Sequence, residues 1–246
     1  MPTVIKGQPT SAEVRAMLAA EGKTVMVAFS GGKDSVATVL ALRDAGVQTE
    51  LAYLYFVPGR EPGEPLGFVK DGLDYLEDKL QQRIRRYPHP SLYRMLNAFT
   101  FTPPERCAII EMARFPEVDD LEMWRVIRKD TGAAKDTWVA DGVKAVDNPP
   151  RCIALTAQGL VKRNTRKVSP IADWLTKEVK GRIEAEGIAL PVDYQWFGRS
   201  FDGIDHRFLK PVKDNAPEDY AQILEWFPLA ELEILRHEFF DGPQVV

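Results

Sequence analysis

Residues 25–35 read VMVAFSGGKDS, and this stretch decides the fold class. Val25–Phe29 is an unbroken apolar run, which is typical of a strand buried on both faces of a parallel sheet. Ser30, Gly31 and Gly32 follow at once, and a helical repeat of apolar residues then runs through Ser35–Ala45. A buried strand, a glycine loop and a helix in this order form the first unit of an α/β fold.

Outward from this stretch, three further segments have strand character: Leu51–Phe56, Thr137–Ala140 and Arg166–Ser169. We therefore expect a Rossmann-like α/β fold with about five parallel strands and flanking helices. The helices are predicted at Ser11–Ala20, Ser35–Ala45, Phe68–Arg86, Ser91–Ala98, Glu105–Phe115, Asp120–Lys129, Asp173–Ala185 and Pro217–Trp226.

The predicted domain organisation follows from the length of the chain and from where these elements fall. At 246 residues the chain is long enough for one sizeable α/β core. Residues 1–190 are predicted to form this domain, with a helical insertion at about 68–130 that prolines divide. Residues 191–246 are rich in aromatic side chains, so we expect a C-terminal extension packed on the same domain.

Composition narrows the class of protein. The net charge of -4 argues against coating of nucleic acid through bulk charge, while a local basic groove stays open. No apolar stretch approaches the ~18 residues that a membrane span needs, so we expect a cytoplasmic protein without a membrane partner. The two cysteines, Cys107 and Cys152, stand far apart, so no iron-sulfur cluster is expected within one chain.

The glycine loop has the chemistry of a phosphate site. A glycine pair between a strand and a helix lets the backbone approach an anion, and the helix dipole stabilises the negative charge. Lys33 adds a positive charge, and Asp34 is the predicted ligand of an accompanying magnesium ion. The hydroxyl groups of Ser30 and Ser35 can donate hydrogen bonds to phosphate oxygens.

The string SGGKDS at Ser30–Ser35 resembles the PP-loop of ATP pyrophosphatases and of phosphoadenosine phosphosulfate (PAPS) reductases. It is not a Walker loop, because the glycine that such a motif needs five positions before Gly22 is Met17. The resemblance implies the adenine nucleotide alpha hydrolase fold, with ATP and Mg²⁺ bound at the loop. With only two cysteines, the chain resembles a short member of the family without a cluster.

A second segment, DGVKAVDNPPR, begins at Asp141 and resembles the second signature of the same family. The resemblance implies that Lys144 and Arg151 neutralise phosphate or a transferred oxyanion, with Lys144 standing where the family usually has arginine. It implies nucleotide contacts for Asp141, Gly142 and Asp147. Asp147 would orient one of the two cations or touch the metal.

Two other features leave alternatives open. Tyr55 and Phe56 end the second predicted strand, where relatives bind the adenine or ribose, and both aromatics fit a core position as well. Short basic runs could follow a nucleic-acid backbone or form solvated faces. These runs contain Arg83, Arg85 and Arg86, and then Lys162, Arg163, Arg166 and Lys167.

The resulting hypothesis is a PP-loop enzyme that binds Mg-ATP and transfers the adenylyl group to an acceptor, with release of pyrophosphate. The sequence does not identify the acceptor, and nucleic acid is one candidate. One alternative is a sulfonucleotide enzyme that uses PAPS or APS by reduction or sulfo transfer, with a thiol from Cys107, Cys152 or a partner protein. Another is a nucleotide-binding module without turnover, and assembly as a homodimer is left open. The predicted catalytic residues are Lys33, Asp34, Lys144 and Arg151.

Overall fold

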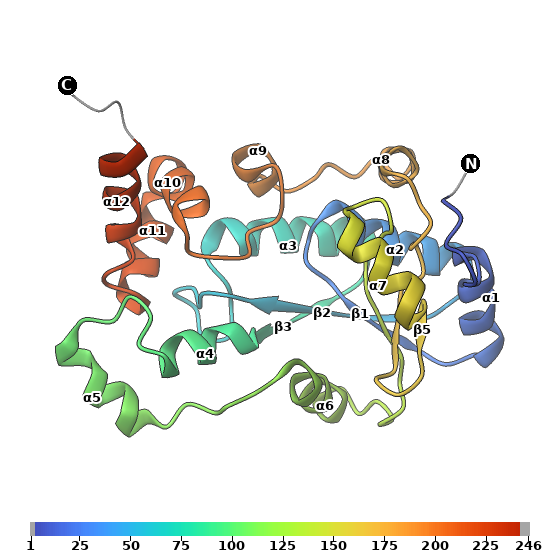
Figure 1. The fold of residues 1–246 in the computed structure, drawn as a ribbon, viewed down its shortest axis with the longest axis horizontal. Coiled ribbons are helices and arrows are strands. Elements are labelled where there is room, and N and C mark those ends of the chain that lie inside the picture. The colour runs from blue at the N-terminus through green and yellow to red at the C-terminus, as the bar shows by residue number, and fades with distance from the viewer. Residues whose placement is uncertain (1–2, 242–246) are drawn as a thin grey trace. The chain divides into compact units, whose positions relative to one another are not determined.

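The computed structural model describes residues 3–241, which form twelve helices and six strands (Figure 1). These residues divide into two compact units. Unit 1 comprises the chain up to Tyr53, Tyr75–Arg85 and Trp124–Leu190, and unit 2 comprises Leu54–Asp74, Arg86–Met123 and the chain from Pro191. Among residues 3–241, no helix combines the length and the apolar character that crossing a membrane would need.

The strands form one sheet in the order β3-β2-β1-β4-β6-β5. Their bounds are Val25–Ala28 (β1), Thr49–Tyr55 (β2), Ile84–Pro88 (β3), Val139–Ala140 (β4), Val161–Lys162 (β5) and Lys167–Val168 (β6). Strand β1 pairs in parallel with β2 and β4, and β4 pairs in parallel with β6. The α/β class is therefore confirmed. The sheet has six strands where about five were expected, and the pair β5–β6 is antiparallel.

Within unit 1, helices cover the sheet because their apolar faces need partners. Helix α1 (Ser11–Glu21) begins with a capping box, in which Thr10 and Glu13 satisfy each other's backbone amides. Helix α2 (Lys33–Asp44) packs against α8 (Thr176–Ala185). The remaining helix of this unit, α7 (Pro149–Gln158), starts from the cap Asn148. Strand β1 is buried almost throughout, as its apolar run predicts.

Unit 2 contains most of the remaining helices. They are α4 (Pro90–Asn97), α5 (Pro104–Ala113), α9 (Asp193–Phe197), α10 (His206–Asn215), α11 (Pro217–Trp226) and α12 (Glu231–Asp241). Two others, α3 (Gly67–Leu80) and α6 (Asp120–Asp130), run across the division between the units. Much of the aromatic side-chain contact in unit 2 is one cluster of tilted and edge-on rings, made by Phe68, Trp196, Phe197, Phe201 and Phe208.

One predicted helix is wrong at its C-terminal end. The segment predicted as Phe68–Arg86 ends as a helix at Leu80, and Gln81 adopts a left-handed conformation with φ of 52°. Ile84 then begins strand β3 and is completely buried. Its pairing partner in the sheet is distant in sequence, so local periodicity could not reveal the strand. The insertion at 68–130 is therefore not purely helical.

Candidate functional site

The loop between β1 and α2 makes a sharp bend that glycine permits. Gly31 has φ of 71°, in the left-handed region, and Gly32 is the extended residue at which α2 begins. The hydroxyl of Ser30 accepts a hydrogen bond from the Gly32 amide at 3.4 Å and donates to Ser35 Oγ at 3.2 Å. Ser35 Oγ in turn donates to the Gly32 carbonyl at 2.9 Å. Both serines therefore hold the loop in shape.

Lys33 and Asp34 open helix α2 as an ion pair. Lys33 Nζ donates to Asp34 Oδ2 at 2.7 Å, and about a quarter of each side chain is exposed. The Asp34 carboxylate lies in the first turn, where the helix dipole stabilises negative charge. Its other oxygen, Oδ1, accepts a hydrogen bond from Lys144 at 2.5 Å. Both oxygens of Asp34 are therefore bound to ammonium groups.

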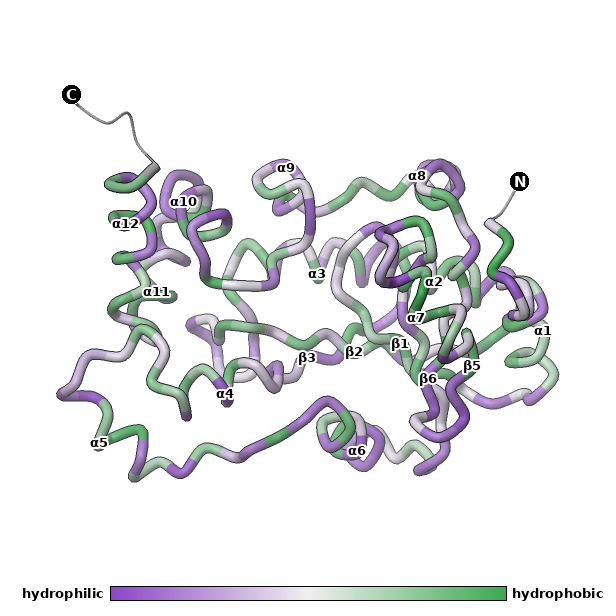
Figure 2. Tube along the Cα trace, viewed as in Figure 1, coloured by the Kyte–Doolittle hydropathy of each residue, from purple (hydrophilic) through white to green (hydrophobic). Residues whose placement is uncertain are grey.

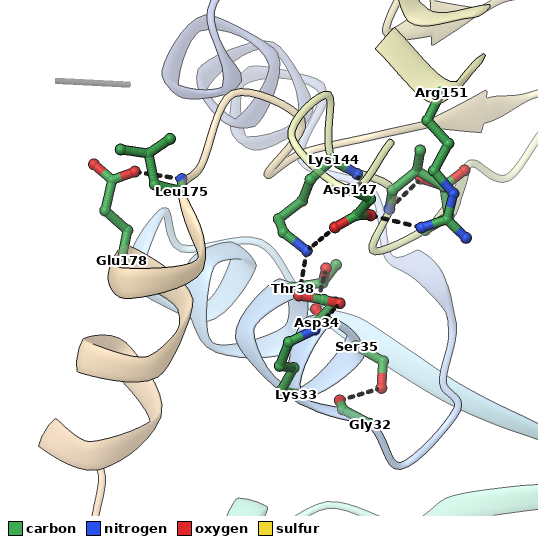
Figure 3. A network of polar contacts seen from close by, with 12 residues as sticks. Gly32, Lys33, Asp34, Ser35, Thr38, Lys144, Asp147, Arg151, Leu175 and Glu178 are labelled. Atoms are coloured by element: carbon green, nitrogen blue, oxygen red, sulfur yellow. Dashed lines mark hydrogen bonds and ion pairs between the residues drawn. The ribbon is translucent and has the colours of Figure 1, made fainter. Parts of the chain in front are cut away.

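Lys144 joins the two predicted signature segments within unit 1. Its side chain is completely buried, and its Nζ contacts Asp34 Oδ1 and, at 2.7 Å, Asp147 Oδ1. Asp147 Oδ2 accepts a hydrogen bond from Arg151 Nη1 at 2.6 Å. Figure 3 shows the resulting chain of alternating charges, Lys33–Asp34–Lys144–Asp147–Arg151. A buried ammonium is tolerated here because two carboxylates compensate it.

The charge of Asp147 is maintained by these contacts. Burial raises the pKa of its carboxyl group, but the hydrogen bonds and positive charges of Lys144 and Arg151 outweigh burial. The pKa of Asp147 therefore lies below its ordinary value. Arg151 lies in the first turn of α7, where the Asn148 side chain accepts a hydrogen bond from its backbone amide at 2.8 Å.

Gly142 explains how closely the two segments approach. A Cβ atom on Gly142 would lie 2.9 Å from the carbonyl carbon of Asp34 and 3.1 Å from its Cβ. Any side chain at this position would push against the backbone of the first turn of α2. The contact requires glycine for close packing rather than for a special backbone angle.

The Asp141 side chain forms hydrogen bonds with other groups of the protein. Its Oδ1 accepts hydrogen bonds from Ser169 Oγ at 2.7 Å and from the Val143 amide at 3.2 Å. Desolvation raises the pKa of Asp141, and these two bonds oppose the rise. Asp141 thus ties the loop after β4 to the segment after β6, and nucleotide contact by this residue stays a prediction.

Tyr55 and Phe56 belong to unit 2, so they are described apart from the loop. Tyr55 is buried, which raises the pKa of its phenol, and its carbonyl accepts a hydrogen bond from the His89 amide at 2.8 Å. The Phe56 ring stacks on the His89 ring with centroids 4.3 Å apart. Their contacts in unit 2 suit a packing role, and adenine or ribose binding stays a prediction.

Neither cysteine is part of the ion-pair chain. Cys152 lies on α7 beside Arg151, Cys107 lies on α5 in unit 2, and both are free thiols of intermediate exposure. Across residues 3–241, no group of three histidine, cysteine or acidic side chains is placed to hold a metal ion.

Sequence reasoning selected the members of the ion-pair chain and expected Asp147 to orient Lys144 or Arg151, but it did not predict the pairing of Lys144 with Asp34. The pairing of Lys144 with Asp147 has a local signal, because the two residues are three apart. The pairing of Lys144 with Asp34 joins positions 110 residues apart and has no signal in a single sequence. Ser169, which donates to Asp141, was assigned to a predicted strand and given no role at the site.

Comparison with known proteins gives matches among solved structures only. No family model and no curated protein matches the chain. The chain is similar to the U34-tRNA thiolase NcsA from Methanococcus maripaludis with its 4Fe-4S cluster: 17% identity and a TM-score of 0.43, covering 90% of this chain and 78% of that chain. It is also similar to the NAD⁺ synthetase from Burkholderia pseudomallei: 15% identity and a TM-score of 0.38, covering 89% of each chain. At these values neither likeness identifies a substrate or a reaction for this chain.

Proposed function

We propose that unit 1 binds Mg-ATP at the Ser30–Ser35 loop and transfers its adenylyl group to an acceptor. In this reaction an acceptor oxygen attacks the α-phosphorus and forms a new P–O bond. The bond from the α-phosphorus to the bridging oxygen breaks, and pyrophosphate leaves with the electron pair. The products are an adenylylated acceptor and pyrophosphate, and AMP is released when a second nucleophile displaces it from the acceptor. The enzyme would thus be an AMP-forming ATP pyrophosphatase of the PP-loop type.

The observation that carries the proposal is the junction of the two signature segments. Gly142 lies against the backbone of Asp34, and Lys144 joins Asp34 to Asp147. The SGGKDS loop resembles a nucleotide loop by sequence, and this junction sets a second cation-bearing segment directly beside it. A loop that was only a tight turn would not need such a partner.

The start of α2 suits an anionic ligand. Its cap is Gly32, and no side chain caps α2 or α8, whereas Thr10 and Asn148 cap α1 and α7 in the same unit. Backbone amides and the helix dipole at such an end attract phosphate. The twelve-residue length of α2 is enough for the dipole to develop.

The exposed ends of the ion-pair chain would meet the phosphates. About a quarter of the Lys33 side chain and half of the Arg151 side chain are exposed, whereas Lys144 is completely buried. We therefore assign charge neutralisation to Lys33 and Arg151, by positioning and electrostatics. Lys144, predicted as catalytic, becomes a positioning residue that holds Asp34 and Asp147 in place.

Magnesium would arrive as part of the nucleotide substrate. Mg²⁺ is commonly held by one or two carboxylates together with substrate phosphates and water. Asp34 is the carboxylate of the loop, and its Oδ2 is bound to Lys33. A turn of Lys33 toward phosphate would release that oxygen for a water molecule of the hydrated ion.

Isothermal titration calorimetry tests the proposal. Mg-ATP and PAPS are titrated separately into the wild type and into Lys33→Ala with Asp34→Ala. We expect ATP to bind the wild type and the double variant to lose at least about tenfold in affinity, because charge-assisted contacts are removed. Lys210→Ala with Asp214→Ala removes an exposed lysine–aspartate pair in unit 2 and is the matched control.

The other outcomes separate the alternatives. Much tighter binding of PAPS than of ATP would favour a sulfonucleotide enzyme. Tight ATP binding without pyrophosphate release, over a screen of acceptors, would favour a module that binds without turnover. Absence of binding by both nucleotides contradicts the proposal.

A further inference from the structure

Strands β5 and β6 form a basic hairpin at the edge of the sheet, in unit 1. The register places Val161 opposite Val168 and Lys162 opposite Lys167. The four-residue turn between the strands adds Arg163. Figure 2 shows hydrophilic chain beside the labels of β5 and β6. We use the name basic hairpin for residues 161–168.

The two lysines directly opposite each other destabilise the hairpin. Side chains of such a cross-strand pair have Cβ atoms about 4.5–5.5 Å apart, and like charges at this distance repel. Lys162, Arg163 and Lys167 form no ion pair with any acidic residue among residues 3–241. No direct ion pair within the described part of the chain therefore offsets the repulsion, and the electrostatic interaction of both lysines with Asp141 stops short of an ion pair.

Arg166 behaves differently from the other three cations and anchors the hairpin. Its guanidinium lies 5.0 Å from the centroid of the Trp138 ring and 3.9 Å from Asp136 Oδ2. Its carbonyl accepts a hydrogen bond from the Val139 amide at 2.8 Å. Arg166 also has φ of 53°, a conformation that non-glycine residues rarely adopt. The turn is thus held in one shape.

We propose that the basic hairpin is a docking surface for the phosphodiester backbone of a nucleic acid, with Lys162, Arg163 and Lys167 as its contacts. Phosphates repeat at short intervals along such a backbone, so a row of unpaired cations can be matched along its length. The chain as a whole is acidic, with net charge -4, so this local concentration of positive charge is not a consequence of composition.

The basic hairpin lies close to the candidate nucleotide site. Strand β6 is only two residues long, and a strand rises about 3.3 Å per residue, so Lys167 lies within roughly 7 Å of the strand end. The register of β6 with β4 sets that end beside Ala140, directly before Asp141. Although desolvation raises the pKa of Asp141, the charges of Lys162 and Lys167 both act to lower it. Nucleic acid on this surface would therefore be the acceptor class, a step that rests on the proposed function.

Fluorescence anisotropy of the full chain tests the docking surface. The probes are a labelled 20-nucleotide single-stranded RNA and a labelled DNA duplex, titrated from 50 to 200 mM salt without ATP. We expect binding of at least one probe, and a loss of about tenfold or more in Lys162→Glu with Lys167→Glu. Because each lost phosphate contact removes about 0.7–0.9 from the slope of log K against log salt, the slope should fall by about 1 to 2.

The matched control reverses the same number of charges elsewhere in unit 1. Lys177 and Lys180 on α8 are exposed, and Lys177→Glu with Lys180→Glu should keep at least half of the wild-type affinity. The single variant Lys162→Glu should bind nucleic acid more weakly while its Tm stays equal or rises, because it replaces repulsion by attraction. A variant that merely destabilised the fold would lower both the nucleic-acid affinity and the Tm.

Three results overturn the docking surface: no binding of either probe, equal affinity of the hairpin double variant, or an equal loss in the α8 control. Binding of poly-glutamate with the same affinity and the same dependence on Lys162 and Lys167 also overturns it, in favour of an acidic protein. ATP titration distinguishes the two proposals. Hairpin variants should keep ATP affinity, whereas Lys33→Ala with Asp34→Ala should keep nucleic-acid affinity.

Discussion

Lys144 and the pair Lys162–Lys167 carry the same charge in the same unit, in opposite surroundings. Lys144 is completely buried and is bound to two carboxylates. Lys162 and Lys167 face each other on the basic hairpin and form no ion pair with an acidic residue among residues 3–241. A buried ammonium must be compensated inside the protein, because water does not reach it. A lysine at the surface is solvated and stays available to an external anion. The burial of a lysine side chain therefore indicates whether it stabilises the fold or can bind a ligand.

The largest expected effect is on Lys144. Lys144→Met leaves Asp34 and Asp147 facing each other with their shared cation removed, and both side chains are mostly buried. We expect the free energy of unfolding to fall by about 3 kcal/mol, near the lower end of values for broken buried pairs. Urea unfolding measures the change.

The control for this variant is Lys177→Met on α8, an exposed position in the same unit. It should change the unfolding free energy by less than about 0.5 kcal/mol. Equal losses in the two variants would mean that burial does not distinguish the two kinds of lysine.

Asp193 in unit 2 is a buried carboxylate without a positively charged partner among the described residues, and it can be compared with the buried, compensated Lys144. Asp193 is 8% exposed, its Oδ2 accepts a hydrogen bond from the Phe201 amide at 3.1 Å, and its Oδ1 is buried without a hydrogen-bond partner in the described structure. Burial raises its pKa to about 6 from 3.8. The folded state then binds more protons than the unfolded state between these values, so stability falls as pH rises from about 4 to about 6.

Asp193→Asn should remove this dependence on pH. Asparagine keeps an oxygen for the Phe201 amide and carries no charge at any pH. We expect the variant to be more stable than the wild type at pH 7, by on the order of 2 kcal/mol, and closer to it at pH 4. Unfolding free energies at both pH values test the sign. A constant difference across this range would contradict the protonation argument.

Gly142 tests whether the two signature segments must touch. Gly142→Ala would set a Cβ 2.9 Å from the carbonyl carbon of Asp34, so the first turn of α2 must shift. We expect a loss of about 1–2 kcal/mol in stability and weaker ATP binding. Gly181→Ala in α8 is the matched control, since its Cβ meets nothing within 4 Å, and it should stabilise the helix by about 0.5–1 kcal/mol. The same sign for both variants would argue against the close contact.

The smallest effect is expected at the surface. Lys162→Glu turns a like-charge cross-strand pair into an attractive one, and should raise the unfolding free energy by about 0.2–1 kcal/mol at low salt. The gain should shrink at 0.5 M salt, because exposed charges are screened. A gain that does not depend on salt would mean that the two lysines do not repel each other.

The parts of the fold that could be predicted well are those whose residue pattern lies within a short stretch of sequence. The strand at 25–29, the glycine loop after it and the helix that follows could all be predicted from the sequence. A strand buried on two faces and a glycine bend each require particular residue types within a few positions. Helix α11 was predicted with the same bounds, Pro217–Trp226. Strand β3 was missed because its pairing in the sheet has no local sequence signal. Helix α7 was missed although Asn148, Pro149 and Pro150 are typical of a helix start.

The sequence by itself determined the α/β class, the position of the glycine loop and the identity of the charged residues around it. Only the tertiary structure decided which charges meet: that Lys144 is buried between Asp34 and Asp147, that Gly142 packs on the α2 backbone, and that Lys162 faces Lys167. The physical reason is that conformational preferences act over a few residues, whereas charge pairing and close packing join positions that only the folded sheet brings together.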